Sequence, residues 1–187
     1  MKVIIDNGHG KNTSGKCSPK WSNGTQLFEW SWTREIAKLL KERLDAQGIE
    51  TILLVTEDYD ISLSERARRC NTISGDKILI SIHGNASTNG NAQGWEVFTT
   101  TAKNNSDKLA QCFIKHFDYC FGSIKRNRGH KEKNFTLLYK ANCPCVLTEN
   151  FFYDNKEDCE YMLSDEGKDA IVEAHYRAIL EFLSQSK

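Results

Sequence analysis

The chain has 187 residues, a length that fits one compact domain, and we expect a single domain over residues 1–187. Lys and Arg together number 25, as do Asp and Glu, so the formal net charge is zero. This balance argues against a general electrostatic grip on nucleic acid, and we expect no nucleic-acid partner. No apolar run approaches membrane-spanning length, so we expect no membrane insertion. We also expect a monomer.

The predicted elements alternate between strands and helices along the chain. A strand over residues 2–6 is followed by a long loop over 10–27, a helix over 28–47, a strand over 50–55 and a helix over 62–74. Then come a strand over 77–82, a loop over 85–94, a strand over 95–99 and a helix over 105–119. The rest comprises a basic loop over 125–133, strands over 135–139 and 144–148, and a terminal helix over 166–183.

This alternation favours an α/β fold, with a mostly parallel, twisted central sheet of about six strands flanked by helices. The helical segments have local support. Apolar residues recur every fourth position from Phe28 to Leu44, and Gly48 is well placed to end that helix. Ser62, with Glu65 three residues later, has the spacing of a capping box at the start of the next helix.

Two apolar runs end at a histidine flanked by glycine. The run from Val3 leads to His9, and the run from Ile78 leads to His83. Runs this rich in Ile and Val predict buried strands, and ligands collect at the carboxyl ends of such strands in open α/β sheets. A third apolar run ends at Glu149. Two imidazoles and a carboxylate at one sheet edge indicate a metal hydrolase, with the histidines as ligands.

The third metal ligand stays open on spacing alone. The candidates are Asp6, Glu29, Glu96 and Glu149. Glu29 opens the first amphipathic helix, where an acid also suits the helix dipole without any metal. Glu149 lies in apolar surroundings that would raise its proton affinity, which suits a general base; the alternative is a solvated acid at a strand end.

Other reactive side chains have simpler interpretations. The seven cysteines are an odd number, and without a secretory signal we expect reduced, partly buried thiols rather than disulfides or a cysteine metal site. His116 and His175 lie on predicted core faces of helices. The basic run from Lys125 to Lys133 is either a solvated loop or a grip for substrate carboxylates.

Several motifs in a fixed order resemble a known family. They are Asp6-Asn7-Gly8-His9-Gly10, Glu29, Ser81-Ile82-His83-Gly84-Asn85, Gly94-Trp95-Glu96-Val97-Phe98 and Val146-Leu147-Thr148-Glu149-Asn150-Phe151. Together they resemble the zinc-dependent N-acetylmuramoyl-L-alanine amidases of the cell-wall-lytic Amidase_3 type, over nearly the whole chain. The departures are mild: Asn7 replaces a usual proline, Gly84 a usual alanine, and Asn150 a usual small residue.

The resemblance implies that His9, Glu29 and His83 bind Zn²⁺ and that Glu149 is the catalytic acid/base. Asn85 is a candidate substrate-binding residue, with loop stabilisation as its alternative. The implied activity is hydrolysis of the amide between N-acetylmuramic acid and L-alanine in peptidoglycan, in cell-wall lysis or remodelling and in the manner of a phage endolysin or a bacterial lytic domain. The alternatives are a zinc peptidase cutting within the stem peptide and a non-catalytic peptidoglycan-binding module.

The start of the chain bears on where such an enzyme would work. Residues 2–6 predict a strand rather than the apolar core of a secretory signal. We therefore expect the chain to be made in the cytoplasm and to act on the cell wall after release or export by another route.

Overall fold

The computed structural model describes residues 1–187 except 102–103, 123–125 and 186–187. Its strands are β1 (Lys2–Asp6), β2 (Thr51–Leu53), β3 (Lys77–Asn85), β4 (Trp95–Thr99), β5 (Asn127–Glu132) and β6 (Cys145–Phe152). Its helices are α1 (Glu29–Ala46), α2 (Leu63–Thr72), α3 (Asn104–Phe121), α4 (Thr136–Lys140), α5 (Lys156–Leu163) and α6 (Asp165–Gln185). Within the described residues, no helix combines the length and the apolar character needed to cross a membrane.

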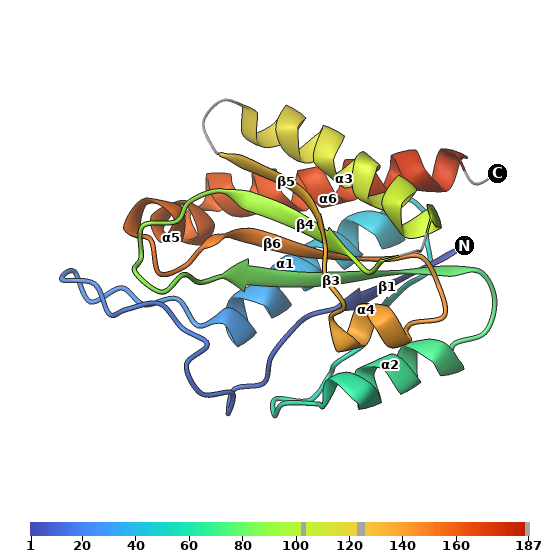
Figure 1. The fold of residues 1–187 in the computed structure, drawn as a ribbon, viewed down its shortest axis with the longest axis horizontal. Coiled ribbons are helices and arrows are strands. Elements are labelled where there is room, and N and C mark those ends of the chain that lie inside the picture. Colours follow the sequence, from blue (N-terminus) through green and yellow to red (C-terminus); the bar gives the residue numbers. More distant parts are fainter. Residues whose placement is uncertain (102–103, 123–125, 186–187) are drawn as a thin grey trace.

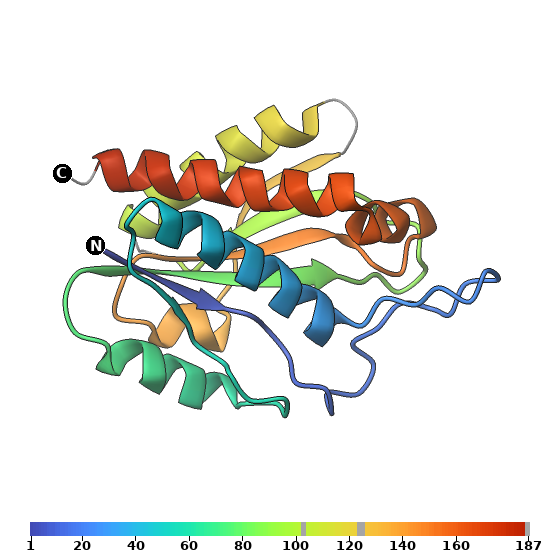
Figure 2. The same cartoon turned by 180° about the vertical axis from the view of Figure 1, so that it is seen from behind.

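The strands form one six-stranded sheet in the order β2-β1-β3-β6-β4-β5. Four of its five pairings are parallel, and β4 runs antiparallel to β6. Figures 1 and 2 show α1, α3 and α6 on one face of the sheet and α2 and α4 on the other. The predicted α/β fold with a mostly parallel, helix-flanked sheet is therefore confirmed.

Strand alternation divides the core into two layers. Val3 and Ile5 of β1 face the larger cluster beneath α1, α3 and α6, whereas Ile4 between them faces the smaller cluster beneath α2 and α4. On β3, Ile80 and Ile82 belong to the larger layer and Leu79 to the smaller one. Ser81 and His83 therefore point to the side of α2 and α4, and they lie nearer the carboxyl end of the strand than Leu79.

This arrangement leaves polar side chains at the carboxyl ends of the parallel strands. The carboxyl ends of β1, β3 and β6 meet there, and the antiparallel β4 begins there. The residues paired across the ladders are Asp6 with Ser81, His83 with Glu149, and Glu149 with Glu96. Acidic side chains and one imidazole therefore line up across the carboxyl ends of these strands. They lie on the same sheet face as Leu79 and Leu147, which are closer to the amino ends of β3 and β6.

The structure corrects three predicted segments. Residues 135–139 were predicted as a strand, but 136–140 form helix α4, because buried Leu137, Leu138 and Ala141 follow helical rather than alternating spacing. The predicted basic loop contains the edge strand β5, whose charged, half-exposed side chains carry no strand-like alternation. Helix α5 was not predicted; Asn155 caps it by accepting a hydrogen bond from the Asp158 amide.

The histidine positions also need a small correction. His83 and Glu149 lie within the last residues of β3 and β6 rather than past the strand ends, while His9 lies three residues beyond β1. Glu149 has register partners on both flanking strands, His83 on β3 and Glu96 on β4, while His83 has Glu149 as its partner on β6.

Candidate metal centre and active site

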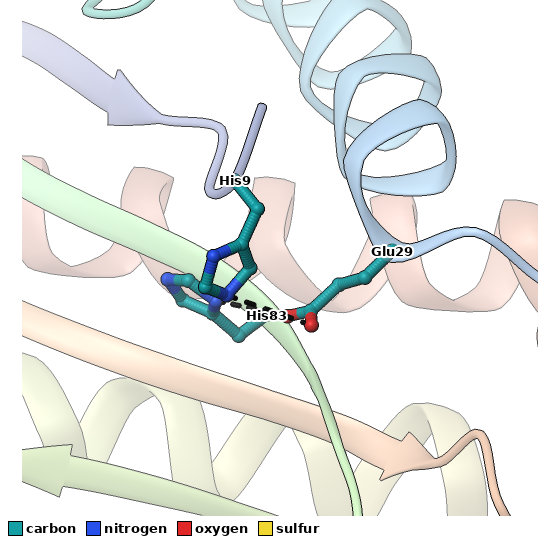
Figure 3. A group of neighbouring side chains, drawn as sticks. All are labelled: His9, Glu29 and His83. Atoms are coloured by element: carbon teal, nitrogen blue, oxygen red, sulfur yellow. Dashed lines mark hydrogen bonds and ion pairs between the residues drawn. The ribbon is translucent and has the colours of Figure 1, made fainter. Parts of the chain in front are cut away.

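His9, Glu29 and His83 come together at the carboxyl edge of the sheet. Figure 3 shows the three side chains converging from the loop after β1, the start of α1 and the end of β3. One ligand atom from each side chain lies within 4.8 Å of the others. Glu29 Oε1 is 3.0 Å from His83 Nδ1, and Glu29 Oε2 is 3.6 Å from His9 Nε2. Two imidazoles and one carboxylate form a donor set that suits a divalent transition metal.

The loop that carries His9 is held by its neighbouring residues. Gly8 has φ +72°, a left-handed conformation that favours glycine, and a Cβ there would lie 3.4 Å from His83 Cε1. A Cβ on Gly10 would lie 2.0 Å from the Asp60 amide nitrogen, so the loop of residues 57–60 packs directly on that position. Arg34 donates one hydrogen bond to the His9 carbonyl and another to the Glu57 carbonyl, which ties the two loops together.

The hydrogen-bond acceptors of Glu29 leave room for a bound cation to contact one carboxylate oxygen. Glu29 Oε1 accepts a hydrogen bond from the Gly84 amide, but Oε2 is buried with no hydrogen-bond partner among the described residues. An ionised carboxylate can only accept, so a proton on His83 Nδ1 or a bound cation must lie between that atom and Glu29. An orphaned buried carboxylate oxygen facing an imidazole nitrogen is what a metal ion would satisfy.

The two histidines differ in charge without a metal. Burial alone would lower the pKa of His83, but the attraction of the Asp6 and Glu29 carboxylates outweighs it and raises that pKa to about 10. Burial lowers the pKa of His9 to about 4; Glu29 opposes this shift and the positive charge on His83 adds to it. Burial also opposes ionisation of Glu29, yet both histidines lower its pKa overall. The group therefore already holds one positive charge beside an ionised acid.

Glu149 lies next to this group on the neighbouring strand. It is the register partner of His83, and its Oε2 is buried without a hydrogen-bond partner among the described residues. Burial raises the pKa of Glu149 to about 7, with a further contribution from Glu29 and an opposing one from His83. A carboxyl group that titrates near neutrality can accept and return a proton, which is the property of a general acid/base.

The residues after Glu149 fix the end of β6. Asn150 is fully buried and donates from Nδ2 to the carbonyl of His83, 3.0 Å away. Phe151 has φ +67°, a strained value for a side chain of this size, and its ring is fully buried in the larger core layer. Asn150, which departs from the usual small residue of the family, therefore stabilises the strand ends that carry His83 and Glu149.

The structure separates the four acids considered as the third ligand. Glu29 is the acid that meets both histidines. Asp6 lies on the other side of the His83 ring, with Oδ2 3.9 Å from Nε2. Glu96 accepts from Asn85 Nδ2 at 2.8 Å and from Arg128 Nε at 2.9 Å, and it also pairs with Lys131.

Asn85 is held within the protein at both ends of its amide. Nδ2 donates to Glu96, and Oδ1 accepts from the Ala86 amide. These contacts favour the loop-stabilising alternative, and a role in substrate binding stays a prediction. Two polar neighbours of the metal group were not singled out from the sequence: Ser81, and Lys16, whose Nζ is 3.8 Å from Glu29 Oε2. The position of Ser81 two residues before His83 on one strand face was the available signal.

The remaining predicted side chains fall outside this group. Lys125 of the basic run lies outside the described residues, while Arg128 and Lys131 converge on Glu96. His175 of α6 is fully buried, with Nε2 3.0 Å from Thr148 Oγ1 of β6, and the half-buried His116 pairs with Glu181. All seven cysteines, which lie within the described residues, are thiols.

Comparison with known proteins identifies the family. The N-acetylmuramoyl-L-alanine amidase model called Amidase_3 matches residues 3–181. The chain is 30% identical to the endolysin of Bacillus phage SPP1, over 99% of this chain and 67% of that protein. It is 31% identical to the N-acetylmuramoyl-L-alanine amidase CwlM of Bacillus licheniformis, over 100% of this chain and 70% of that protein.

A solved structure extends the likeness to three dimensions. The N-acetylmuramoyl-L-alanine amidase from Clostridium difficile 630 superposes with a TM-score of 0.89 at 32% identity, covering 100% of this chain and 98% of that one. The fold and the named relatives together define a hydrolase with a mostly parallel α/β sheet. The chain belongs to the Amidase_3 family of N-acetylmuramoyl-L-alanine amidases.

Proposed function

We propose that this chain is a zinc-dependent N-acetylmuramoyl-L-alanine amidase that hydrolyses the amide between N-acetylmuramic acid and L-alanine in peptidoglycan. The observation that carries the proposal is the group of His9, Glu29 and His83 beside Glu149, in a chain of this family. The relatives named as amidases support the reaction, and the donor set supports zinc.

In this proposal His9, Glu29 and His83 hold the metal. Neutral His9 offers a lone pair at Nε2, and ionised Glu29 offers the oxygen that lacks a hydrogen bond. A ligand nitrogen must be unprotonated, so metal binding at Nδ1 of His83 would release that proton to the solvent. Bound zinc supplies Lewis acidity, both for the amide carbonyl and for the attacking water.

Glu149 moves the proton. Its pKa of about 7 leaves a substantial ionised fraction at neutral pH, and that form takes a proton from the attacking water. The protonated Glu149 then gives this proton to the leaving amine of L-alanine, which restores the carboxylate.

The proposal is tested by the products released from purified peptidoglycan. Incubation with the zinc-loaded chain is expected to create new L-alanine amino termini, and a chelator is expected to abolish their release. New amino termini at other stem residues would instead indicate a zinc peptidase. Binding to the wall without any release would indicate a non-catalytic binding module.

A further inference from the structure

A buried chain of polar contacts leads from His83 away from Glu29. His83 Nε2 lies 3.2 Å from Ser81 Oγ, and Ser81 Oγ donates to Asp6 Oδ2 at 2.6 Å. On the far side, Arg66 Nη1 lies 3.3 Å from Asp6 Oδ1. Asp6 and Ser81 are completely buried and Arg66 is 1% exposed, so water does not compete for these contacts.

The sheet and α2 hold these groups in place. Asp6 and Ser81 are register partners on β1 and β3, and Ser81 shares one strand face with His83. Arg66 comes from α2 and is fixed by two further contacts, from Nε to the Ile61 carbonyl at 2.7 Å and from Nη2 to Asp60 at 2.5 Å. Asp6 and Ser81 are therefore fixed by the strand register, and the guanidinium of Arg66 is fixed by its own hydrogen bonds.

The direction of each hydrogen bond follows from this arrangement. Arginine is always charged in proteins, and its buried ion pair keeps Asp6 an ionised acceptor. Ser81 has one hydroxyl proton, and it donates this proton to Asp6. The Ser81 oxygen must then accept from His83, so Nε2 of His83 carries a proton. Nδ1 is left as the ring nitrogen that faces Glu29 and can bind a metal.

We propose that Asp6, acting through Ser81 and anchored by Arg66, is a positioning residue that fixes the tautomer and ring orientation of His83 for metal binding through Nδ1. The inference rests on the proposed function, because it assigns the support of the same metal site. A carboxylate that holds the ring nitrogen of a ligating histidine opposite the metal typically contributes about 10–100-fold to metal affinity. Asp6, which the sequence left as a possible ligand, thereby has a role without touching the metal.

A purely structural role for Asp6 makes a different prediction. If Asp6 served only to pair with Arg66, removing the Ser81 hydroxyl would leave that ion pair intact and would not change metal binding. Ser81→Ala therefore separates the two roles. Ser106→Ala is the matched control, because Ser106 is equally buried but bonds to the Cys145 amide at the start of β6, whereas the metal group lies at the carboxyl ends of the strands.

The test measures zinc affinity by competition with a chromophoric chelator for the unchanged chain, Ser81→Ala, Asp6→Asn and Ser106→Ala. We expect zinc affinity about 10–100-fold weaker in Ser81→Ala and in Asp6→Asn, and unchanged in Ser106→Ala. Should Asp6→Asn fail to fold, because it leaves Arg66 without its buried counter-charge, Ser81→Ala decides. Nitrogen NMR of the histidine rings in the zinc-loaded unchanged chain should show the His83 proton on Nε2.

The outcomes distinguish this inference from the proposed function. Equal zinc affinity in Ser81→Ala and the unchanged chain overturns the positioning role, as does a His83 proton found on Nδ1 with zinc bound. If the unchanged chain still releases L-alanine termini in either case, the amidase proposal stands. An unchanged chain without measurable zinc affinity overturns both.

Discussion

His83 and Glu149 are direct neighbours across the parallel strands β3 and β6, where both strands approach their carboxyl ends. Asn150 reinforces this pairing by donating to the carbonyl of His83. The same strand register therefore sets the place of the imidazole proposed to bind the metal and of a carboxyl group with a pKa of about 7. His83 and Glu149 are thus held on two rigid strands, whereas His9 lies in the loop after β1 and Glu29 at the start of α1.

Replacing Glu149 should separate these two functions. Glu149→Gln keeps the size of the side chain but cannot accept a proton, so we expect turnover to fall by about 10²–10⁴-fold. Zinc content should be unchanged, because His9, Glu29 and His83 remain. Metal analysis and release of L-alanine termini measured on one preparation check this. Undiminished turnover with zinc bound would remove Glu149 from the acid/base role.

Gly10 should tolerate no side chain. Gly10→Ala would place a Cβ 2.0 Å from the Asp60 amide, so the loop of residues 57–60 or the His9 loop must move. We expect a loss of stability above about 1 kcal/mol together with weaker zinc binding. Gly15→Ala is the control, since its Cβ meets nothing within 4 Å and only its φ of +75° is strained, at a cost of about 1–2 kcal/mol. Zinc affinity that falls equally in both variants would contradict the steric explanation.

Asn150 should be required for stability at the strand ends. Asn150→Ala removes the buried donor to the His83 carbonyl and leaves that oxygen without this hydrogen bond. We expect a loss of about 1–3 kcal/mol in the free energy of unfolding, measured by urea denaturation. Asn71→Ala is a useful comparison, because the Asn71 amide bonds to the Lys140 carbonyl on the exposed surface, away from the site. An equal loss in both variants would mean that burial at Asn150 contributes nothing specific.

His175 should make the fold sensitive to acid. Burial lowers its pKa from 6.5 to about 4, and the neutral ring donates from Nδ1 to the Ile171 carbonyl. Between these values the unfolded chain binds more protons than the folded one, so stability falls as the pH drops from about 6.5 towards 4. The full effect is roughly 3 kcal/mol.

The comparison of His175→Gln with the unchanged chain isolates this effect. The glutamine variant should lose part of the dependence of unfolding free energy on pH between 4 and 6.5, because it has no proton to bind there. Carboxylates that titrate in the same range cancel in the difference between the two proteins. Parallel pH profiles for the two proteins would rule out a buried, neutral His175.

Much of the fold and two of the three residues of the metal group could be predicted from local pattern. Apolar runs ending at His9 and His83 identify strands and ligands together, because a buried strand and its carboxyl end are both visible in sequence. The third ligand could not be chosen in this way. Glu29 reaches the site only because the loop of residues 7–28 folds back and starts α1 beside β3, and no spacing rule encodes that path.

The features missed from the sequence are ones that local sequence pattern does not reveal. Strand β5 is a charged edge strand, so its pairing with β4 rather than its composition makes it a strand. Helix α4 is a single short helix whose buried residues Leu137 and Leu138 are consecutive, which resembles a short buried strand in sequence. The Asp6–Ser81 link likewise depends on the register of β1 against β3, which sequence alone does not fix.

The same structure explains one departure from the family pattern. A Cβ at Gly84, where alanine is usual, would lie 2.9 Å from Met162 Cε and 3.1 Å from Tyr153 Cδ1. In this chain those two side chains occupy the space that an alanine methyl would need. The substitution is therefore a packing adjustment next to His83, with the metal group left intact.

The most direct test of the metal site is a crystal structure of the zinc-loaded chain, with an anomalous difference map collected at the zinc absorption edge. We expect one strong peak bonded to His9 Nε2, His83 Nδ1 and a Glu29 carboxylate oxygen, with Glu149 beside it and not bonded to it. A peak bonded through His83 Nε2, or one held by a different set of residues, would contradict the site described for this chain.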